Sequence, residues 1–192
     1  METERHPLKP FIPKETKVLM LGSFPPKIER WSMDFFYPNF QNDMWRIFGL
    51  IFFNDKDHFV VNGQKRFDKE EIETFCQKRG IALYDTASEI IRLKDNASDN
   101  YLKITKETDI RRLLSEMPKC DSVIVTGQKA CEIVAKQFLI DAPKIGEKKL
   151  FHIGGRTISL YRTPSSSRAY PLALEKKAET YKKCLCEIGI IH

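Results

Sequence analysis

The residues best able to bind or react with a ligand gather in a few loops, and the first of these loops follows the apolar run at residues 17–21. It reads Gly22-Ser-Phe-Pro-Pro26 and continues into a stretch rich in aromatic residues. There, Phe36 and Tyr37 could stack on a planar ligand, a contact that contributes about 1–3 kcal/mol when the ligand is a nucleobase. Packing over the sheet is the alternative role for these rings, and their spacing alone favours it.

A second loop has the composition of a phosphate-binding site. Its hydroxyl and backbone N–H groups could donate to phosphate oxygens, and its arginine could form a bidentate contact. A plain polar turn is the alternative interpretation of the same residues. A third loop, at the start of a predicted helix, could also hold an anion. The candidate residues are Pro164, Ser165, Ser166, Ser167 and Arg168 in the second loop, and Thr126, Gly127 and Lys129 in the third.

Several other kinds of chemistry are excluded by the sequence. It contains no Walker A segment, no Gly-x-Gly-x-x-Gly after a strand and no Gly-x-Ser-x-Gly. The five cysteines include no Cys-x-x-Cys, and the pair Cys184 and Cys186 has no neighbouring histidine except His192. A zinc or iron–sulfur site is therefore not expected, and we expect no cofactor.

The elements that must position these loops alternate between strands and helices. Apolar runs predict strands at 17–21, 81–84, 122–125, 150–153 and 157–161. Helices are expected from Asn42 or Asp43 to about residue 51, and at 68–79, 86–93, 106–117, 128–138 and 172–186, with loops at 54–67 and 94–105.

This alternation predicts a three-layer α/β/α sandwich with a central, mainly parallel sheet. We expect residues 1–192 to form a single domain with a polar N-terminal arm at 1–16. Ligands in such sheets bind outside the carboxyl ends of the strands. This rule points to the loops after Leu21, Tyr84, Val125 and Tyr161. Those after Leu21, Val125 and Tyr161 should meet at one groove, with Lys129 and Arg168 near its mouth.

The composition is typical of a globular protein, because 42% of the 192 residues are hydrophobic and 30% are charged. The longest apolar stretch, 47–53, is too short to span a bilayer. We expect no membrane association and a cytoplasmic location, since the N-terminus lacks the features of a secretory signal. The net charge is +6, and residues 121–192 carry 12 Lys and Arg against 7 Asp and Glu. This charge is compatible with a phosphate-bearing partner or simply with solubility.

Five segments, taken in chain order, resemble motifs of the uracil-DNA glycosylase superfamily, and together they cover roughly residues 17–185. The first of them begins Gly-Ser and has no carboxylate or amide side chain, which is most similar to the hypoxanthine-DNA glycosylase type branch. The segments are Gly22–Pro26, Tyr37–Asn42 with Trp45, Gly80–Asp85 with Arg92, Val125–Ala130 and Thr163–Ser167.

The resemblance implies a monofunctional DNA glycosylase, a monomeric hydrolase that removes a flipped uracil or hypoxanthine from damaged or mismatched duplex DNA or from single-stranded DNA. It assigns catalysis to Asn42, whose amide oxygen would accept a hydrogen bond from the attacking water while its NH₂ group is held by the protein. Tyr37 would stack on the base. The remaining residues that the resemblance places around the base are Gly22, Ser23, Phe24, Pro25 and Phe36.

Three residues depart from the family pattern. Phe24 stands where sister branches carry the catalytic Asp or Asn, Pro26 removes an N–H group, and Asp43 adds a negative charge close to the DNA. These departures keep open a non-catalytic nucleic-acid-binding module of the same fold. An α/β enzyme acting on free nucleosides or nucleotides is a third possibility. Asn42 could also serve only as the cap of the following helix.

Overall fold

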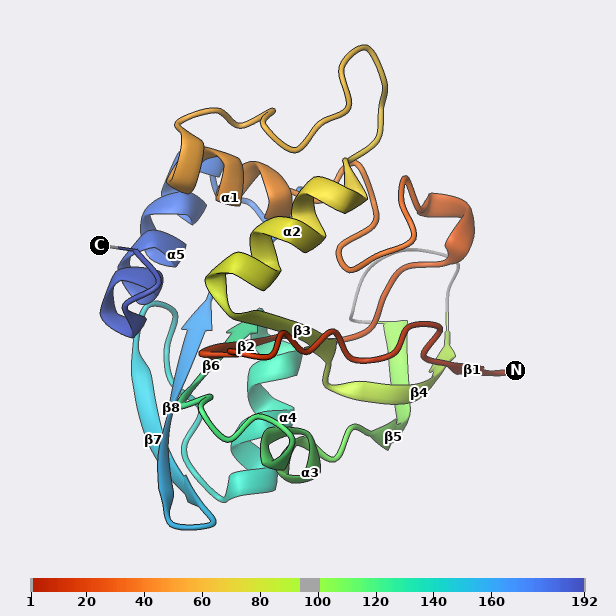
Figure 1. The fold of residues 1–192 in the computed structure, drawn as a ribbon. Helices are drawn as coiled ribbons and strands as arrows, with labels where there is room; N and C mark the ends of the chain where they lie inside the picture. Colours follow the sequence, from red (N-terminus) through yellow and green to blue (C-terminus); the bar gives the residue numbers. More distant parts are fainter. Residues whose placement is uncertain (1, 94–100, 192) are drawn as a thin grey trace.

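The computed structural model describes residues 2–93 and 101–191, and it is built around a five-stranded sheet (Figure 1). The strand order is β3-β2-β6-β8-β7. The first four strands in this order are parallel, and β7 pairs antiparallel with β8 at the edge. Their bounds are β2 (Val18–Gly22), β3 (Ile81–Asp85), β6 (Ser122–Thr126), β7 (Lys148–Ile153) and β8 (Arg156–Thr163). The predicted α/β architecture with a mainly parallel sheet is confirmed.

Helices cover both faces of this sheet, as Figure 1 shows. Successive side chains of a strand point to opposite faces. Val18 and Met20 accordingly pack with the first helical layer, whereas Leu19 and Leu21 pack with the second. This two-sided burial explains why the strands are continuous apolar runs. The first layer contains α1 (Met44–Phe53), α2 (Lys69–Arg79) and α5 (Leu174–Ile188), and the second contains α3 (Ile110–Ser115) and α4 (Gln128–Phe138).

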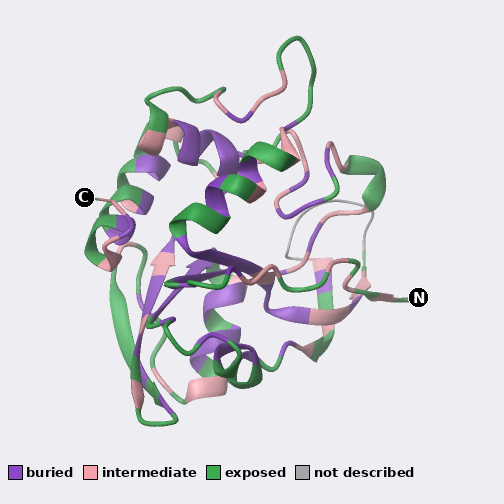
Figure 2. Ribbon diagram, in the orientation of Figure 1, coloured by how far each residue is buried: buried purple, intermediate pink, exposed green. Residues whose placement is uncertain are grey.

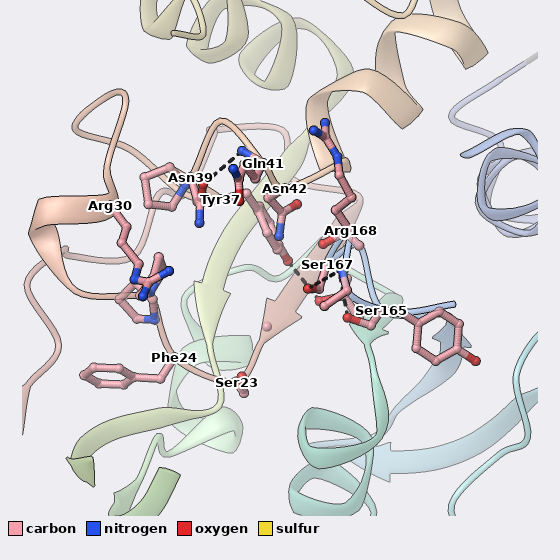
Figure 3. Close-up of a pocket in the computed structure, with 18 of the residues that line it drawn as sticks. Ser23, Phe24, Arg30, Tyr37, Asn39, Gln41, Asn42, Ser165, Ser167 and Arg168 are labelled. Atoms are coloured by element: carbon pink, nitrogen blue, oxygen red, sulfur yellow. Dashed lines mark hydrogen bonds between the residues drawn. The ribbon is translucent and has the colours of Figure 1, made fainter. Parts of the chain in front are cut away.

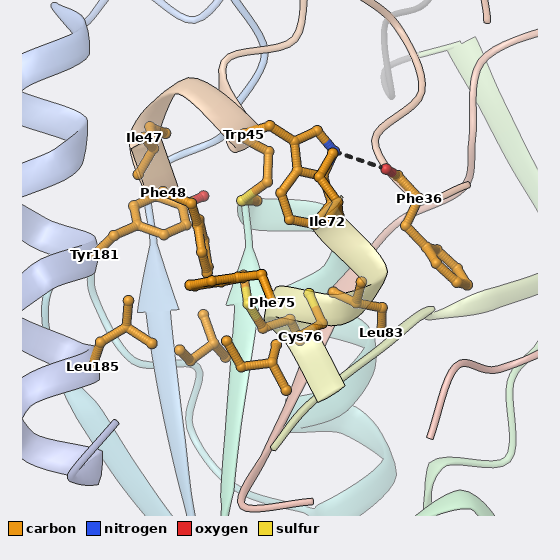
Figure 4. Packing of buried hydrophobic residues seen from close by; sticks show 14 of the residues in the cluster. Phe36, Trp45, Ile47, Phe48, Ile72, Phe75, Cys76, Leu83, Tyr181 and Leu185 are labelled. Carbon is orange, nitrogen blue, oxygen red and sulfur yellow. Dashed lines mark hydrogen bonds between the residues drawn. The ribbon is translucent and has the colours of Figure 1, made fainter. Parts of the chain in front are cut away.

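Burial follows the same layers, since the inner strands β2, β3 and β6 are buried, whereas the edge strand β7 and the outer faces of the helices are largely exposed (Figure 2). Trp45 of α1 is the largest fully buried side chain and packs against Phe48 and Phe59. Its indole N–H donates a hydrogen bond of 3.0 Å to the backbone oxygen of Phe36 (Figure 4). The core therefore holds the aromatic segment that precedes α1 in place.

The predicted ends of α2 and the predicted bounds of α4 are confirmed. Asp68 accepts a hydrogen bond from the backbone N–H of Glu71 and begins α2, and Gly80 ends it in the left-handed conformation. The predicted helix at 128–138 coincides with α4. Among the described residues, no helix is long and apolar enough to cross a membrane.

The region between β3 and α3 was predicted wrongly. A second sheet, antiparallel and ordered β1-β4-β5, occupies it. The expected helix at 86–93 is strand β4, and residues 102–107, expected as loop and helix start, form strand β5; the expected-loop residues 94–100 lie outside the described residues. The N-terminal arm supplies the third strand. The bounds are β1 (Thr3–Arg5), β4 (Ala87–Arg92) and β5 (Leu102–Glu107).

Tertiary contacts explain this error. Ala87 and Ile90 of β4 are buried together with Leu102, and Phe24 of the first loop packs on this small cluster. A six-residue segment with two apolar positions three apart fits a helix as well as a strand when its partners are unknown. Here the pairing with β1 and β5, rather than the periodicity of the segment itself, selects the strand.

Candidate active site

A cavity of about 620 Å³ opens at the carboxyl ends of the parallel strands (Figure 3). Its walls are the loop after β2, the aromatic segment before α1, the end of β3 and the loop after β8. This is where the strand-end rule places a ligand in an α/β sheet. The volume lies within the usual range for small-molecule sites, which is roughly 300–1,000 Å³.

Most of the residues singled out from the sequence border this one cavity, and Phe24 and Ser165 face it from different loops. The exceptions are Gly127, Lys129 and Pro164, which do not line it. The Gly127 N–H donates to the backbone oxygen of Thr163, and the Lys129 ammonium donates to that of Leu102. The backbone oxygen of Pro164 accepts a hydrogen bond from the Tyr181 hydroxyl. Those that line the cavity are Gly22, Ser23, Phe24, Pro25, Phe36, Tyr37, Asn42, Thr126, Ser165, Ser166, Ser167 and Arg168.

Tyr37 is held in an unusual backbone conformation. Its φ is +51°, in the left-handed region that residues with a side chain seldom adopt. The phenol oxygen lies 3.2 Å from Thr126 Oγ1, and the ring makes an edge contact with Trp45. Phe36, by contrast, is almost fully buried and packs on Phe35 and Tyr84. Of the two candidate stacking residues, Tyr37 is therefore the one with more of its side chain available to a ligand.

Asn42 lines the cavity and also holds the start of α1. Its Oδ1 accepts a hydrogen bond of 2.9 Å from the backbone N–H of Met44. This reverses the expected orientation, in which the NH₂ group was held by the protein and the oxygen faced water. Because an amide oxygen carries two lone pairs, one acceptor position remains beside the NH₂ donors. Because the Met44 N–H must meet an acceptor, the amide atom that faces the start of α1 is Oδ1 and not the NH₂ nitrogen.

Asp43 does not present the unpaired negative charge that the sequence suggested. Its carboxylate is buried, with Oδ2 3.1 Å from Lys177 Nζ and Oδ1 3.3 Å from Arg168 Nε. Lys177 is itself fully buried and also donates to the oxygen of Ser167, while the Asp43 N–H donates to the oxygen of Ser166. Asp43 thus fastens the serine-rich loop to the start of α1.

Asp85 is a site residue that the sequence analysis missed. It ends β3, is paired with Gly22 of β2 and lines the cavity. A Cβ atom on Gly22 would overlap Asp85 Oδ1, so the glycine is needed for this close approach. Burial, and secondly the nearby Asp85 carboxylate, raise the pKa of Tyr84. The strand-end rule pointed to the loop after Tyr84, where this residue lies, but Asp85 was not among the predicted site residues.

The other oxygen of Asp85 is bound from the N-terminal arm. His6 Nε2 lies 2.8 Å from Asp85 Oδ2. From the same arm, Glu4 binds Arg92 through two hydrogen bonds of 3.0 Å, and Arg92 also donates to the oxygen of Pro25. The arm therefore supports both the end of β3 and the first loop. Nothing in its sequence pattern indicated this role.

The mouth of the cavity is bordered by two arginines. Arg168 and Arg30, the latter from the short 3-10 helix η1 (Ile28–Arg30), lie on opposite sides of the cavity in Figure 3. Within the described part of the chain, Arg30 has no ion pair, so its charge is available at the rim. In the same part of the chain, no three His, Cys, Asp or Glu side chains are grouped as metal ligands would be.

Comparison with known proteins adds evidence on the fold. No family model and no curated protein matches the sequence. A solved structure from Methanosarcina acetivorans, described as a "putative Uracil DNA glycosylase", superimposes with a TM-score of 0.63 over 96% of this chain and 99% of that chain. The two chains share this fold. They are 19% identical, and the comparison does not distinguish the hypoxanthine branch from others.

The buried pair of Lys177 and Asp43 predicts a large effect on stability. Lys177→Met should lower the free energy of unfolding by about 3–5 kcal/mol, because it leaves the Asp43 carboxylate buried without its main cation. Lys176→Met is the matched control, since Lys176 is an exposed neighbour paired only with Glu179, and it should change stability little. Urea unfolding of both variants measures the difference. Equal stability of the two would contradict the assigned role of the pair.

Proposed function

We propose that the protein is a monofunctional DNA glycosylase that hydrolyses the N-glycosidic bond of a flipped deaminated base, uracil or hypoxanthine. The observation that carries the proposal is the convergence of Tyr37, Asn42 and Asp85 on one base-sized cavity. The fold shared with the Methanosarcina acetivorans protein supports it, as do the motifs that resemble the superfamily.

Base recognition follows from the chemistry of Asp85. Uracil and hypoxanthine carry a hydrogen on a ring nitrogen of the Watson–Crick edge, whereas cytosine and adenine carry a lone pair at the same place. An ionised carboxylate accepts hydrogen bonds but cannot donate them. Asp85 would therefore bind the deaminated bases and repel their parent bases, and Tyr37 would stack on the base plane.

The hydrolytic step would use Asn42. Its remaining acceptor position or its NH₂ group would hold a water molecule near C1′ of the sugar. As the glycosidic bond breaks, its electron pair leaves with the base, and the water oxygen bonds to C1′ and loses a proton, which the departing base anion takes up. The positive charge that develops on the sugar is stabilised by nearby acceptors and phosphates. No lysine is found among the described residues that line the cavity, and the proposal therefore includes no imine intermediate.

A non-catalytic module that binds the same flipped base is the second candidate. The hydrogen bond from Met44 to Asn42 Oδ1 favours it, because that bond gives Asn42 a structural role that does not need catalysis. The first loop also offers Phe24 where a group able to orient water would be needed.

Two substitutions of Asn42 separate these functions. Asn42→Ser removes the amide but keeps an oxygen able to accept from the Met44 N–H, whereas Asn42→Ala removes both. Under the glycosylase proposal, both variants should lose excision of uracil or hypoxanthine by about 10²–10⁴-fold. Only Asn42→Ala should lose stability, by about 1 kcal/mol. Single-turnover cleavage measures the loss of excision, and thermal melting measures the loss of stability. If Asn42→Ser remained active, the role of Asn42 would be limited to holding the start of α1.

Stacking by Tyr37 predicts a graded pair of effects on binding. Tyr37→Ala should weaken binding to an oligonucleotide with a central hypoxanthine by about 1–3 kcal/mol. Tyr37→Phe keeps the ring and removes the hydroxyl that contacts Thr126, so its affinity should stay close to that of the unmodified protein. Fluorescence anisotropy measures both. If the two variants bind equally well, the ring does not stack on the base.

The arginine at the rim predicts how DNA binding depends on salt. Each phosphate that a cation neutralises contributes a slope of about −0.9 to log K against log salt concentration. Arg30→Gln should therefore reduce the slope by about one contact. Arg112→Gln, on the exposed side of α3, should leave the slope unchanged. A slope that is equal in all three proteins would remove Arg30 from the DNA interface.

A further inference from the structure

We propose that His6 is a positioning residue that fixes the orientation of the Asp85 carboxylate, and that it thereby sets the preference of the cavity for deaminated bases. The inference rests on the proposed recognition of a base by Asp85. It assigns a specific task in the site to the N-terminal arm, which lies 79 residues before Asp85 in the sequence.

The two oxygens of the Asp85 carboxylate have different surroundings. Oδ2 is 2.8 Å from His6 Nε2, and the side chains of His6 and Asp85 are only 2% and 10% exposed. Oδ1 lies against the Cα side of Gly22, where the missing side chain leaves room. With Oδ2 engaged by the imidazole, the carboxylate cannot rotate without breaking that bond. Oδ1 is then the acceptor left for a ligand.

The second ring nitrogen of His6 lets this contact survive a change in charge. Nδ1 lies 2.9 Å from the backbone oxygen of Leu8 and 3.1 Å from its backbone nitrogen. A protonated Nδ1 can donate to that oxygen, and an unprotonated Nδ1 can accept from that N–H. In both states Nε2 carries a hydrogen that it can donate to Asp85. The carboxylate therefore keeps its donor whether the imidazole is neutral or positive.

The backbone and ring of His6 are held from several sides. Its N–H donates to the oxygen of Ser88, immediately after β1 pairs with β4. The centroid of its ring lies 4.7 Å from that of Tyr84 and 5.3 Å from that of Phe24, which it meets edge to face. The other titratable or charged groups around Asp85 are Tyr84 on β3, Tyr37 in the aromatic segment, Arg92 on β4 and its partner Glu4 on β1.

Loss of this donor would change which bases the cavity accepts. Without Nε2, Oδ2 loses its hydrogen-bond donor, and the nearly buried carboxylate can turn so that Oδ1 no longer meets the ring N–H of a deaminated base. The same movement weakens the repulsion between Oδ1 and the lone pair on the ring nitrogen of adenine or cytosine. Selectivity that comes from repulsion of the wrong base is then lost together with affinity for the right one.

Three variants test this role. His6→Leu removes the donor, and His6→Gln supplies a side-chain N–H that cannot titrate in this range. Arg5→Ala is the matched control, because Arg5 is the neighbouring, exposed residue of the arm. The readout is the ratio of affinities for two oligonucleotides, one with hypoxanthine and one with adenine. Both carry 2′-fluorinated sugars that resist hydrolysis, so that the measurement does not require turnover.

We expect His6→Leu to lower this ratio by about tenfold or more, and His6→Gln to restore most of it. Arg5→Ala should leave it within about twofold of the unmodified protein. An unchanged ratio in His6→Leu, or a ratio as low in His6→Gln as in His6→Leu, would overturn the proposal.

A further measurement separates this inference from the proposed function. The ring nitrogen resonances of His6 should shift in Asp85→Asn, which keeps the shape of the side chain but removes its charge. Absence of that shift would overturn the pairing of His6 with Asp85. A protein that excises no base, yet shows the shift and the altered affinity ratio, would refute the glycosylase proposal and leave the role of His6 intact.

Discussion

The candidate site depends on one buried ion pair, between Lys177 of α5 and Asp43 at the start of α1. Burying two charges is unfavourable unless each finds partners, and here both do. Lys177 also donates to Ser167, and Asp43 binds Arg168 and, through its N–H, Ser166. These contacts bring the serine-rich loop against Asn42, with which Ser167 forms an isolated bridge. Two walls of the cavity, more than 120 residues apart in sequence, are joined at this point.

A second set of contacts acts on the opposite wall. The N-terminal arm adds strand β1 beside β4; Glu4 of this strand fixes Arg92, and His6, the residue after the strand, fixes Asp85. Arg92 then holds the first loop through Pro25. Each wall is thus supported by a pair of side chains that do not line the cavity, Asp43 and Lys177 for one and Glu4 and His6 for the other. Because other side chains stabilise the walls, the residues that line the cavity can be selected for their contacts with a ligand.

The sequence predicted those features that local signals determine. The apolar runs of β2, β3 and β6 and the cap and stop of α2 are specified by residues next to one another, and the strand-end rule then placed the cavity. What could not be predicted depends on partners distant in sequence. Residues 87–92 form a strand because β1 and β5 pair with them. The negative charge of Asp43 is balanced because Lys177, from another helix, forms an ion pair with it. Asp85 was within reach of the same rule, but His6 was not, since an isolated histidine in a polar arm gives no pattern.

The close contact between Gly22 and Asp85 also has a consequence for how such sequences can vary. The two residues are paired across neighbouring parallel strands, and the carboxylate occupies the space that any side chain at position 22 would need. A side chain at position 22 is therefore tolerated only with a compensating change at position 85. In related chains that keep this arrangement, positions 22 and 85 should covary, and a residue larger than glycine at the first should accompany a smaller, uncharged residue at the second.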